Sequence, residues 1–186
     1  DLSTAFSFNI VVGVITYTLL CLAAPYISKL FSEPQLTPLL RIVGLNILFL
    51  SLSIVPTALL TAKLNIRTQA IINSLSLIPA GIVAIVAAYK GAGVYSLAIQ
   101  SVLSSFIKMT FLWIYSEWIP KWGFDKSSFN YLWSFGSKLL YANLIGTIFN
   151  EIYSVLIGKF LGKTELGYYS KASHLNQNVN GTTSGI

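Results

Sequence analysis

The sequence has few charged residues and almost none of the side chains that most often hold metals. Only 10% of the 186 residues are charged, whereas soluble domains carry about 25%. A soluble fold with 54% hydrophobic residues could not cover its apolar surface with so few charges. Cys21 is the single cysteine and His174 the single histidine, which excludes a disulfide framework and a cysteine-based metal site. These scarcities favour a membrane protein.

Acidic residues are also scarce, and they form no pattern typical of catalysis. The chain has 6 Asp and Glu against 12 Lys and Arg. The basic residues stand singly between apolar runs, as the helix-end anchors of membrane proteins do, rather than in a cluster that would bind nucleic acid. We therefore expect no nucleic-acid partner, no metal, no cofactor and no enzymatic activity.

Five apolar stretches are long enough to cross a membrane as helices, which takes about 20 residues. They cover residues 4–24, 38–60, 68–89, 94–115 and 138–161. Their polarity does not alternate, so helices rather than barrel strands are predicted. Pro25 and Pro34 are expected to end the first helix. Because the chain begins without Met or a signal peptide, we expect an internal segment of a longer membrane protein.

Residues 116–137 connect the fourth and fifth stretches. Within them, Phe129, Leu132, Trp133 and Gly136 recur at helical spacing, which predicts a short amphipathic helix that lies in the membrane interface. The predicted fold class is therefore an all-α membrane protein with about five transmembrane helices and one interfacial helix.

The fifth stretch carries a polar stripe. Asn143, Thr147, Asn150 and Glu151 recur every three or four residues and so share one helical face. Because unpaired polar groups are costly in lipid, this face should meet other helices or a wet cavity. Ionisable residues inside a membrane span are usually functional, although Glu151 could instead pair with a basic residue and hold helices together.

A second stripe runs along the fourth stretch, where Gln100, Ser104 and Lys108 are spaced by four. Lys108 lies about two turns from the end of the predicted helix, so it could line a cavity or extend to the interface. Arg41 lies near one end of the second stretch, where an anchoring role competes with a cavity role.

Four segments of the chain resemble one protein family. They are residues 3–48, residues 53–71 (SIVPTALLTAKLNIRTQAI), residues 91–113, and residues 135–175, which begin FGSKLLYANLIGTIFNEIYSVLIGKF. They resemble bacterial polysaccharide and O-antigen flippases, the lipopolysaccharide and exopolysaccharide exporters of the multidrug/oligosaccharidyl-lipid/polysaccharide superfamily. The resemblance covers essentially the whole chain.

The resemblance implies a multi-pass protein of the bacterial inner membrane, with two helical bundles around a cavity that opens alternately to either side. Residues 1–115 would be later helices of the first bundle, and residues 116–137 a cytoplasmic or interfacial connection. Residues 138–186 would be the first helix of the second bundle and the entry to the next. The implied substrate is an oligosaccharide on undecaprenyl pyrophosphate. Membrane lipids, a polysaccharide polymerase and glycosyltransferases are the implied partners.

Such a substrate needs cations at its pyrophosphate and amide or hydroxyl groups at its sugars. The candidates of these types are Arg41, Gln100, Ser104, Lys108, Asn143, Thr147 and Asn150. Glu151 is the candidate for binding a coupling proton or sodium ion. Three alternatives stay open at this point. The first is a cation-coupled multidrug antiporter of the same superfamily, and the second is a non-transport component of polysaccharide assembly. The third is a membrane-embedded sugar-modifying enzyme, such as an acyltransferase or polymerase, whose catalytic residues would have to lie outside this sequence.

Overall fold

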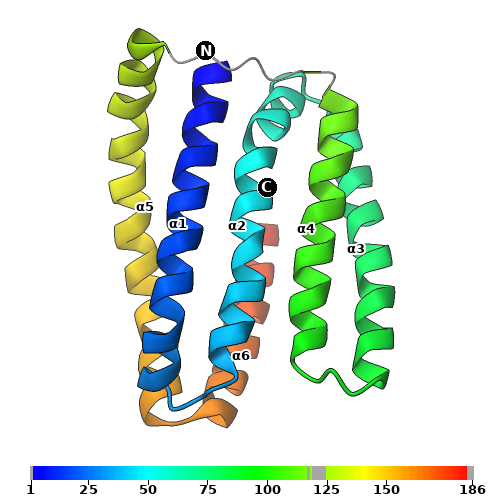
Figure 1. The fold of residues 1–186 in the computed structure, drawn as a ribbon, viewed down its shortest axis with the longest axis vertical. Coiled ribbons are helices and arrows are strands. Elements are labelled where there is room, and N and C mark those ends of the chain that lie inside the picture. Colours follow the sequence, from blue (N-terminus) through cyan, green and yellow to red (C-terminus); the bar gives the residue numbers. More distant parts are fainter. Residues whose placement is uncertain (1, 117, 119–124, 184–186) are drawn as a thin grey trace. The chain divides into compact units, whose positions relative to one another are not determined.

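The computed structural model describes residues 2–116, 118 and 125–183. These residues form six α-helices and no strand (Figure 1). The helices are α1 (Leu2–Leu30), α2 (Leu36–Ala62), α3 (Ile66–Tyr89), α4 (Tyr95–Ser116), α5 (Lys126–Phe160) and α6 (Lys163–Thr183). Helices α1 to α4 and the Gly136–Phe160 part of α5 are long and apolar enough to cross a membrane. The predicted all-α membrane fold is therefore confirmed.

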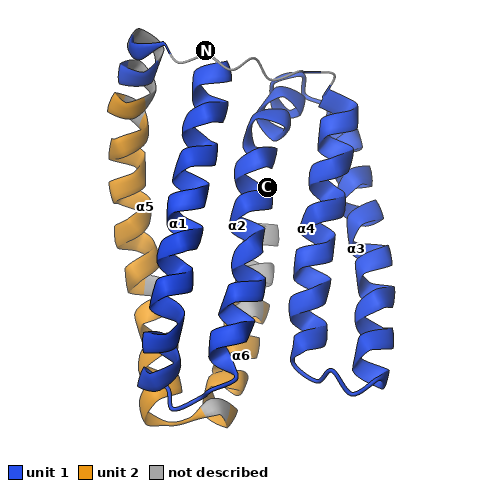
Figure 2. Cartoon of the chain, in the orientation of Figure 1, with its two compact units in different colours: residues 1–130 blue, residues 131–186 orange. Residues whose placement is uncertain are grey.

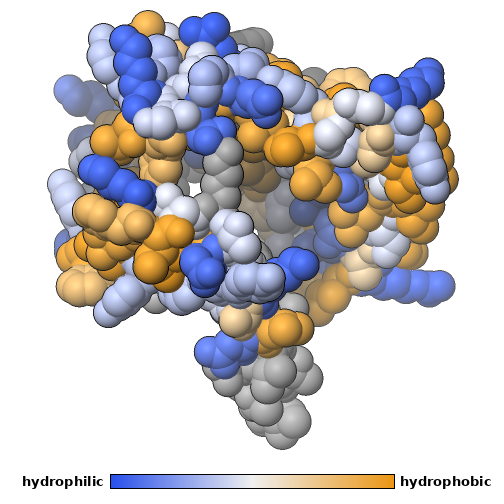
Figure 3. Space-filling model, turned by 90° about the horizontal axis from the view of Figure 1, so that it is seen from below, coloured by the Kyte–Doolittle hydropathy of each residue, from blue (hydrophilic) through white to orange (hydrophobic). Residues whose placement is uncertain are grey.

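The chain divides into two compact units, residues 1–130 and 131–186 (Figure 2). In the first unit the helices lie in the order α1, α2, α4, α3, and α2 contacts all three of the others. Figure 3 views the end at which α1 joins α2 and α3 joins α4. Hydrophilic side chains lie among hydrophobic ones over this end.

Glycines bring α1 and α2 into close contact. Gly13 is buried against Ser51, and Gly44 is buried against Tyr17 and Leu20. Small residues at such crossings let two helix backbones approach closely, which is how membrane helices gain packing energy without a hydrophobic driving force. The contact fixes one face of α2 against α1.

Helix α1 ends within residues 24–35, the segment with Pro25 and Pro34 that is expected to end it, but six residues beyond the first predicted apolar stretch. It continues to Leu30 and places Pro25 inside the helix. Membrane helices tolerate proline when surrounding groups compensate for the lost hydrogen bond. The helix ends instead at a turn around buried Ser28, whose carbonyl accepts a hydrogen bond from the Glu33 N–H (3.0 Å) and whose hydroxyl donates to the Glu33 carbonyl (2.6 Å). Ser32 adopts φ 55° in this turn, as the left-handed residue after a helix commonly does.

The amphipathic helix predicted within residues 116–137 is not separate from the fifth span. Lys126–Phe160 is one continuous helix of 35 residues. No proline interrupts this stretch, and an isolated Gly136 costs a helix only about 1 kcal/mol. Residues 117 and 119–124 of the predicted connection lie outside the described residues.

An aromatic cluster joins the beginning of α1 to the end of α4. The Phe6 ring lies 5.6 Å from the Trp113 ring and 5.5 Å from the Trp118 ring, measured between centroids in edge-on geometry. Nearby, the N–H of Asp125 donates to the Thr4 hydroxyl at 3.1 Å. These contacts hold Trp118 and Asp125 against the first turns of α1.

We expect Gly13→Ala to destabilise the first unit. The added Cβ would clash with the Ser51 hydroxyl and lie 2.8 Å from the Ser51 Cβ. Overpacking of this kind costs about 1–3 kcal/mol. Gly81→Ala on α3 is the matched control, because its Cβ would meet only the Gln100 amide at 3.9 Å. Thermal unfolding in detergent should show a lower Tm for Gly13→Ala alone. Equal Tm values for the two variants would contradict the close α1–α2 contact.

Candidate functional site

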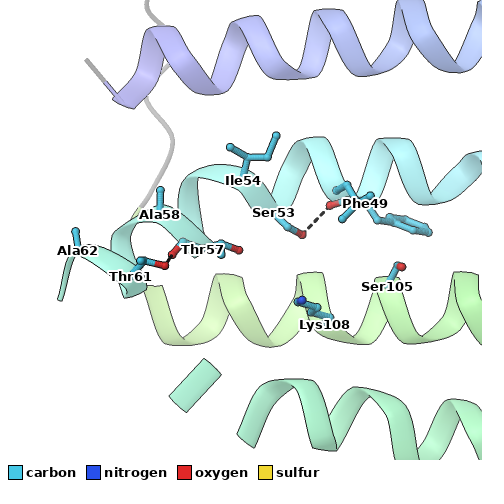
Figure 4. A pocket seen from close by; sticks show the side chains of 10 residues that line it. Phe49, Ser53, Ile54, Thr57, Ala58, Thr61, Ala62, Ser105 and Lys108 are labelled. Atoms are coloured by element: carbon cyan, nitrogen blue, oxygen red, sulfur yellow. Dashed lines mark hydrogen bonds between the residues drawn. The ribbon is translucent and has the colours of Figure 1, made fainter. Parts of the chain in front are cut away.

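A groove of about 670 Å³ lies between α2 and α4 in the first unit (Figure 4). Helix α4 contributes Ser105 and Lys108 to its lining. The second half of α2 contributes Phe49, Leu50, Ser53, Ile54, Thr57, Ala58, Thr61 and Ala62. The walls of this α2–α4 groove are therefore apolar, apart from one cation and a row of hydroxyl groups.

The local sequence of α2 explains the groove. Phe49, Ser53, Thr57 and Thr61 are spaced by four residues, so they lie along one face of the helix. Pro56 is buried within the same half of α2. Its ring and missing N–H bend a helix, and Figure 1 shows the last turns of α2 leaning away from the axis of the first ones. The small side chains of Ser53, Thr57, Ala58 and Ala62 leave space beside α4.

Lys108 is the only charged residue among the described residues that line the groove. Figure 4 shows its side chain reaching from α4 toward α2. The side chain is half-buried, and it forms no ion pair or hydrogen bond with any described residue. Lys108 lies eight residues before the end of α4, about 12 Å along the helix axis. Because an unpaired charge is costly at such a depth, the groove favours water or an anion near this amine.

Only some of the hydroxyls in the groove can donate to a ligand. The Ser53 hydroxyl donates to the Phe49 carbonyl (2.7 Å), and the Thr61 hydroxyl donates to the Thr57 carbonyl (2.9 Å). The hydroxyls of Thr57 and Ser105 form no hydrogen bond with the described residues. The groups left to donate are therefore the Lys108 amine and the Thr57 and Ser105 hydroxyls.

The side chains of the predicted stripe on α4 do not all face the same helix. Lys108 lines the groove, whereas the Gln100 amide lies beside Gly81 of α3. Residues eight apart on a helix differ in direction by about 80°, which explains why these two side chains face different helices. Ser104 is partly buried but does not line the groove.

A polar pair beyond the predicted stripes also joins α2 to α4. The Asn46 amide donates to the Ser101 hydroxyl at 2.7 Å. The other amide atom, Oδ1, is buried without a hydrogen-bond partner among the described residues. This pair joins α2 to α4 on the side of the groove that is nearer the start of both helices.

Arg41 is not brought together with Lys108. Its side chain is exposed, and it lies twelve residues before Ser53, about 18 Å along α2. The Arg41 carbonyl accepts a long hydrogen bond from the Tyr17 hydroxyl (3.5 Å). Its role in binding a substrate stays a prediction.

The polar stripe on α5 belongs to the second unit. Asn143 and Thr147 line a hollow of about 380 Å³ along α5 together with Gly136 and three leucines. Glu151 is exposed on the same helix, whereas the side chain of Asn150 lies outside the described residues. The ion-coupling role of Glu151 therefore stays a prediction.

Sequence analysis missed the hydroxyl row on α2. The signal was available as the four-residue spacing of Ser53, Thr57 and Thr61, but hydroxyl residues occur so often in membrane helices that spacing alone does not mark a site. Among the described residues, no three His, Cys, Asp or Glu side chains lie close enough together to hold a metal ion.

Comparison with known proteins identifies relatives across nearly the whole chain. A family described as "Polysaccharide biosynthesis protein" matches residues 1–185. The teichuronic acid biosynthesis protein TuaB of Bacillus subtilis is 29% identical over 92% of this chain. The succinoglycan biosynthesis transport protein ExoT of Rhizobium meliloti is 25% identical over 91%. The amylovoran biosynthesis protein AmsL of Erwinia amylovora is 27% identical over 93%.

The chain spans 36%, 34% and 45% of the lengths of TuaB, ExoT and AmsL, respectively. No solved structure matches it.

Proposed function

We propose, because this chain belongs to the family of polysaccharide biosynthesis proteins, that it works in a transporter which carries lipid-linked oligosaccharides across the bacterial inner membrane. The chain itself is multi-pass, with five helices able to span a bilayer. One similar protein is described as a transport protein for succinoglycan biosynthesis. The substrate we propose is an oligosaccharide on undecaprenyl pyrophosphate.

The observation that carries this proposal is the unpaired Lys108 in the α2–α4 groove. A pyrophosphate cannot cross the hydrocarbon unaided, because transferring an isolated charge from water to a low-dielectric medium costs tens of kcal/mol on idealised estimates. A cation held below the membrane surface lowers that barrier, since opposite charges attract more strongly where the dielectric is low. The Thr57 and Ser105 hydroxyls are placed to add hydrogen bonds to the same anion.

The groove favours this substrate over that of a multidrug antiporter. An antiporter for organic cations needs a carboxylate in its binding site, whereas the described residues that line the groove include a cation and no carboxylate. Glu151, the acidic candidate, lies on α5 in the other unit. We therefore assign Glu151 to ion coupling or to a pair with a cation, rather than to contact with the pyrophosphate.

We further propose that the protein has no catalytic step of its own. Glycosyltransferases would supply its substrate on the cytoplasmic side, and a polysaccharide polymerase would consume it after transport. A non-transport assembly component would tolerate loss of the Lys108 charge, whereas a transporter of this substrate would not. Export by a variant without this charge therefore distinguishes the two functions.

We expect Lys108→Gln to lower polysaccharide export about tenfold, since hydrogen bonds to charged groups contribute about 1.5–3 kcal/mol. Export is measured as surface polysaccharide in cells that lack the native gene and carry the variant. Lys108→Arg should retain most activity because it keeps the charge. Lys90→Gln, which changes an exposed lysine after α3, is the matched control. Normal export by Lys108→Gln at normal membrane level would refute a transport role for this cation.

We expect Glu151→Gln to abolish export while the protein remains in the membrane, because glutamine keeps the size of the side chain but cannot bind and release a proton. Glu165→Gln removes another exposed carboxylate, in the first turn of α6, and should export normally. If Glu151→Gln matched Glu165→Gln, the charge of Glu151 would be dispensable and ion coupling at this residue would be ruled out.

A further inference from the structure

We infer, on the basis of the function proposed above, that the α2–α4 groove binds the phosphate-bearing end of the lipid carrier and does not recognise the sugars attached to it. The ligand class is an aliphatic phosphate ester. The groove would then determine which carrier the protein accepts, and sugar specificity would be determined elsewhere.

The hydrogen-bonding groups of the groove match a phosphate better than a sugar. The three groups left to donate are the Lys108 amine and the hydroxyls of Thr57 and Ser105. A phosphate accepts hydrogen bonds and carries negative charge, so it suits this set. A sugar hydroxyl both donates and accepts, and no carboxylate or amide side chain, which commonly bind such groups, is among the described residues that line the groove.

The rest of the groove suits an aliphatic chain. Leu50 and Ile54 line it with 55% and 47% of their surfaces exposed, and Phe49, Ala58 and Ala62 complete the apolar wall. The residues of α2 that line the groove extend from Phe49 to Ala62, a distance of about 20 Å along the helix axis. A volume of about 670 Å³ is within the range of sites for small organic ligands. The groove therefore has room for a phosphate and the adjoining segment of chain.

The position of Lys108 along α4 favours the phosphate of a transported carrier over that of a resident phospholipid. A resident phospholipid keeps its phosphate at the membrane surface, near the helix ends. Lys108 begins about 12 Å along α4 from its last residue, whereas Lys63 stands at the end of α2. An anion matched to Lys108 is consequently one that has moved below the surface, as the phosphate of a transported carrier must.

The test is a binding measurement on the full chain, purified in detergent and followed by native mass spectrometry. The probes are undecaprenyl phosphate, undecaprenol, phosphatidylglycerol and inorganic phosphate, with free oligosaccharide as a competitor. We expect undecaprenyl phosphate to bind most tightly, because it alone combines the phosphate with the carrier chain. Free oligosaccharide should not displace it.

Variants connect the binding to the groove. Lys108→Gln should weaken the binding of undecaprenyl phosphate about tenfold, and Ser105→Ala about fivefold, because each removes a donor. Ser104→Ala is the matched control, since Ser104 directly precedes Ser105 on α4 but does not line the groove. Its affinity should equal that of the unmodified protein.

Four results would overturn the inference. They are equal binding of undecaprenol, Lys108-dependent binding of phosphatidylglycerol with the same affinity, displacement by free oligosaccharide, and a Lys108→Gln affinity equal to that of Ser104→Ala. Transport of the complete lipid-linked oligosaccharide is measured separately in vesicles. If transport occurs while the binding results fail, only the role of the groove is wrong; if transport is absent, the proposed function is wrong.

Discussion

Lipid offers no hydrogen-bonding partner, so the spanning helices must satisfy their own polar groups. Several hydroxyls in the helices of the first unit, though not those of Thr57 and Ser105, meet this constraint locally, because they donate to backbone carbonyls one turn earlier. Such bonds join Thr18 to Val14 (2.8 Å), Ser51 to Ile47 (2.8 Å), Ser74 to Ala70 (3.1 Å) and Thr110 to Phe106 (2.9 Å). Lys108 does not fit this pattern, since none of the described residues pairs with its charge. A ligand stabilises most where it supplies the partner for a charge or hydrogen-bonding group that the protein leaves without one.

Helix α2 connects the stability of the first unit to its groove. One face packs on α1 through Gly44 and Ser51, where the backbones approach too closely to admit larger residues. Another face carries the row Ser53, Thr57 and Thr61 and lies beside α4. Close packing on the first face holds α2 in place, and Pro56 lies within the half of α2 that lines the groove. The groove thus depends on residues that do not line it.

The spanning helices could be predicted because a run of about 20 apolar residues has few other stable structures. The ends of α2, α3 and α4 lie within two residues of the predicted ones, whereas buried Ser28 and its turn let α1 continue past Pro25 to Leu30. The site was only partly predictable. A spacing of four suggests a shared face, but the helix rotates enough between Gln100 and Lys108 to turn them toward different neighbours. Which helix packs against each face of α4 depends on the tertiary structure, so the spacing of residues within one helix cannot predict it.

The central claim is that a polar ligand can reach the space beside Lys108 from water. Cysteines at positions 105 and 104 test it most directly, with Cys21→Ser as background and a charged methanethiosulfonate as reagent. Ser105→Cys should react quickly in membranes, because Ser105 lines the groove, and Ser104→Cys should react slowly, because Ser104 does not. Equal rates at both positions, or faster reaction at position 104, would contradict a groove open to charged ligands.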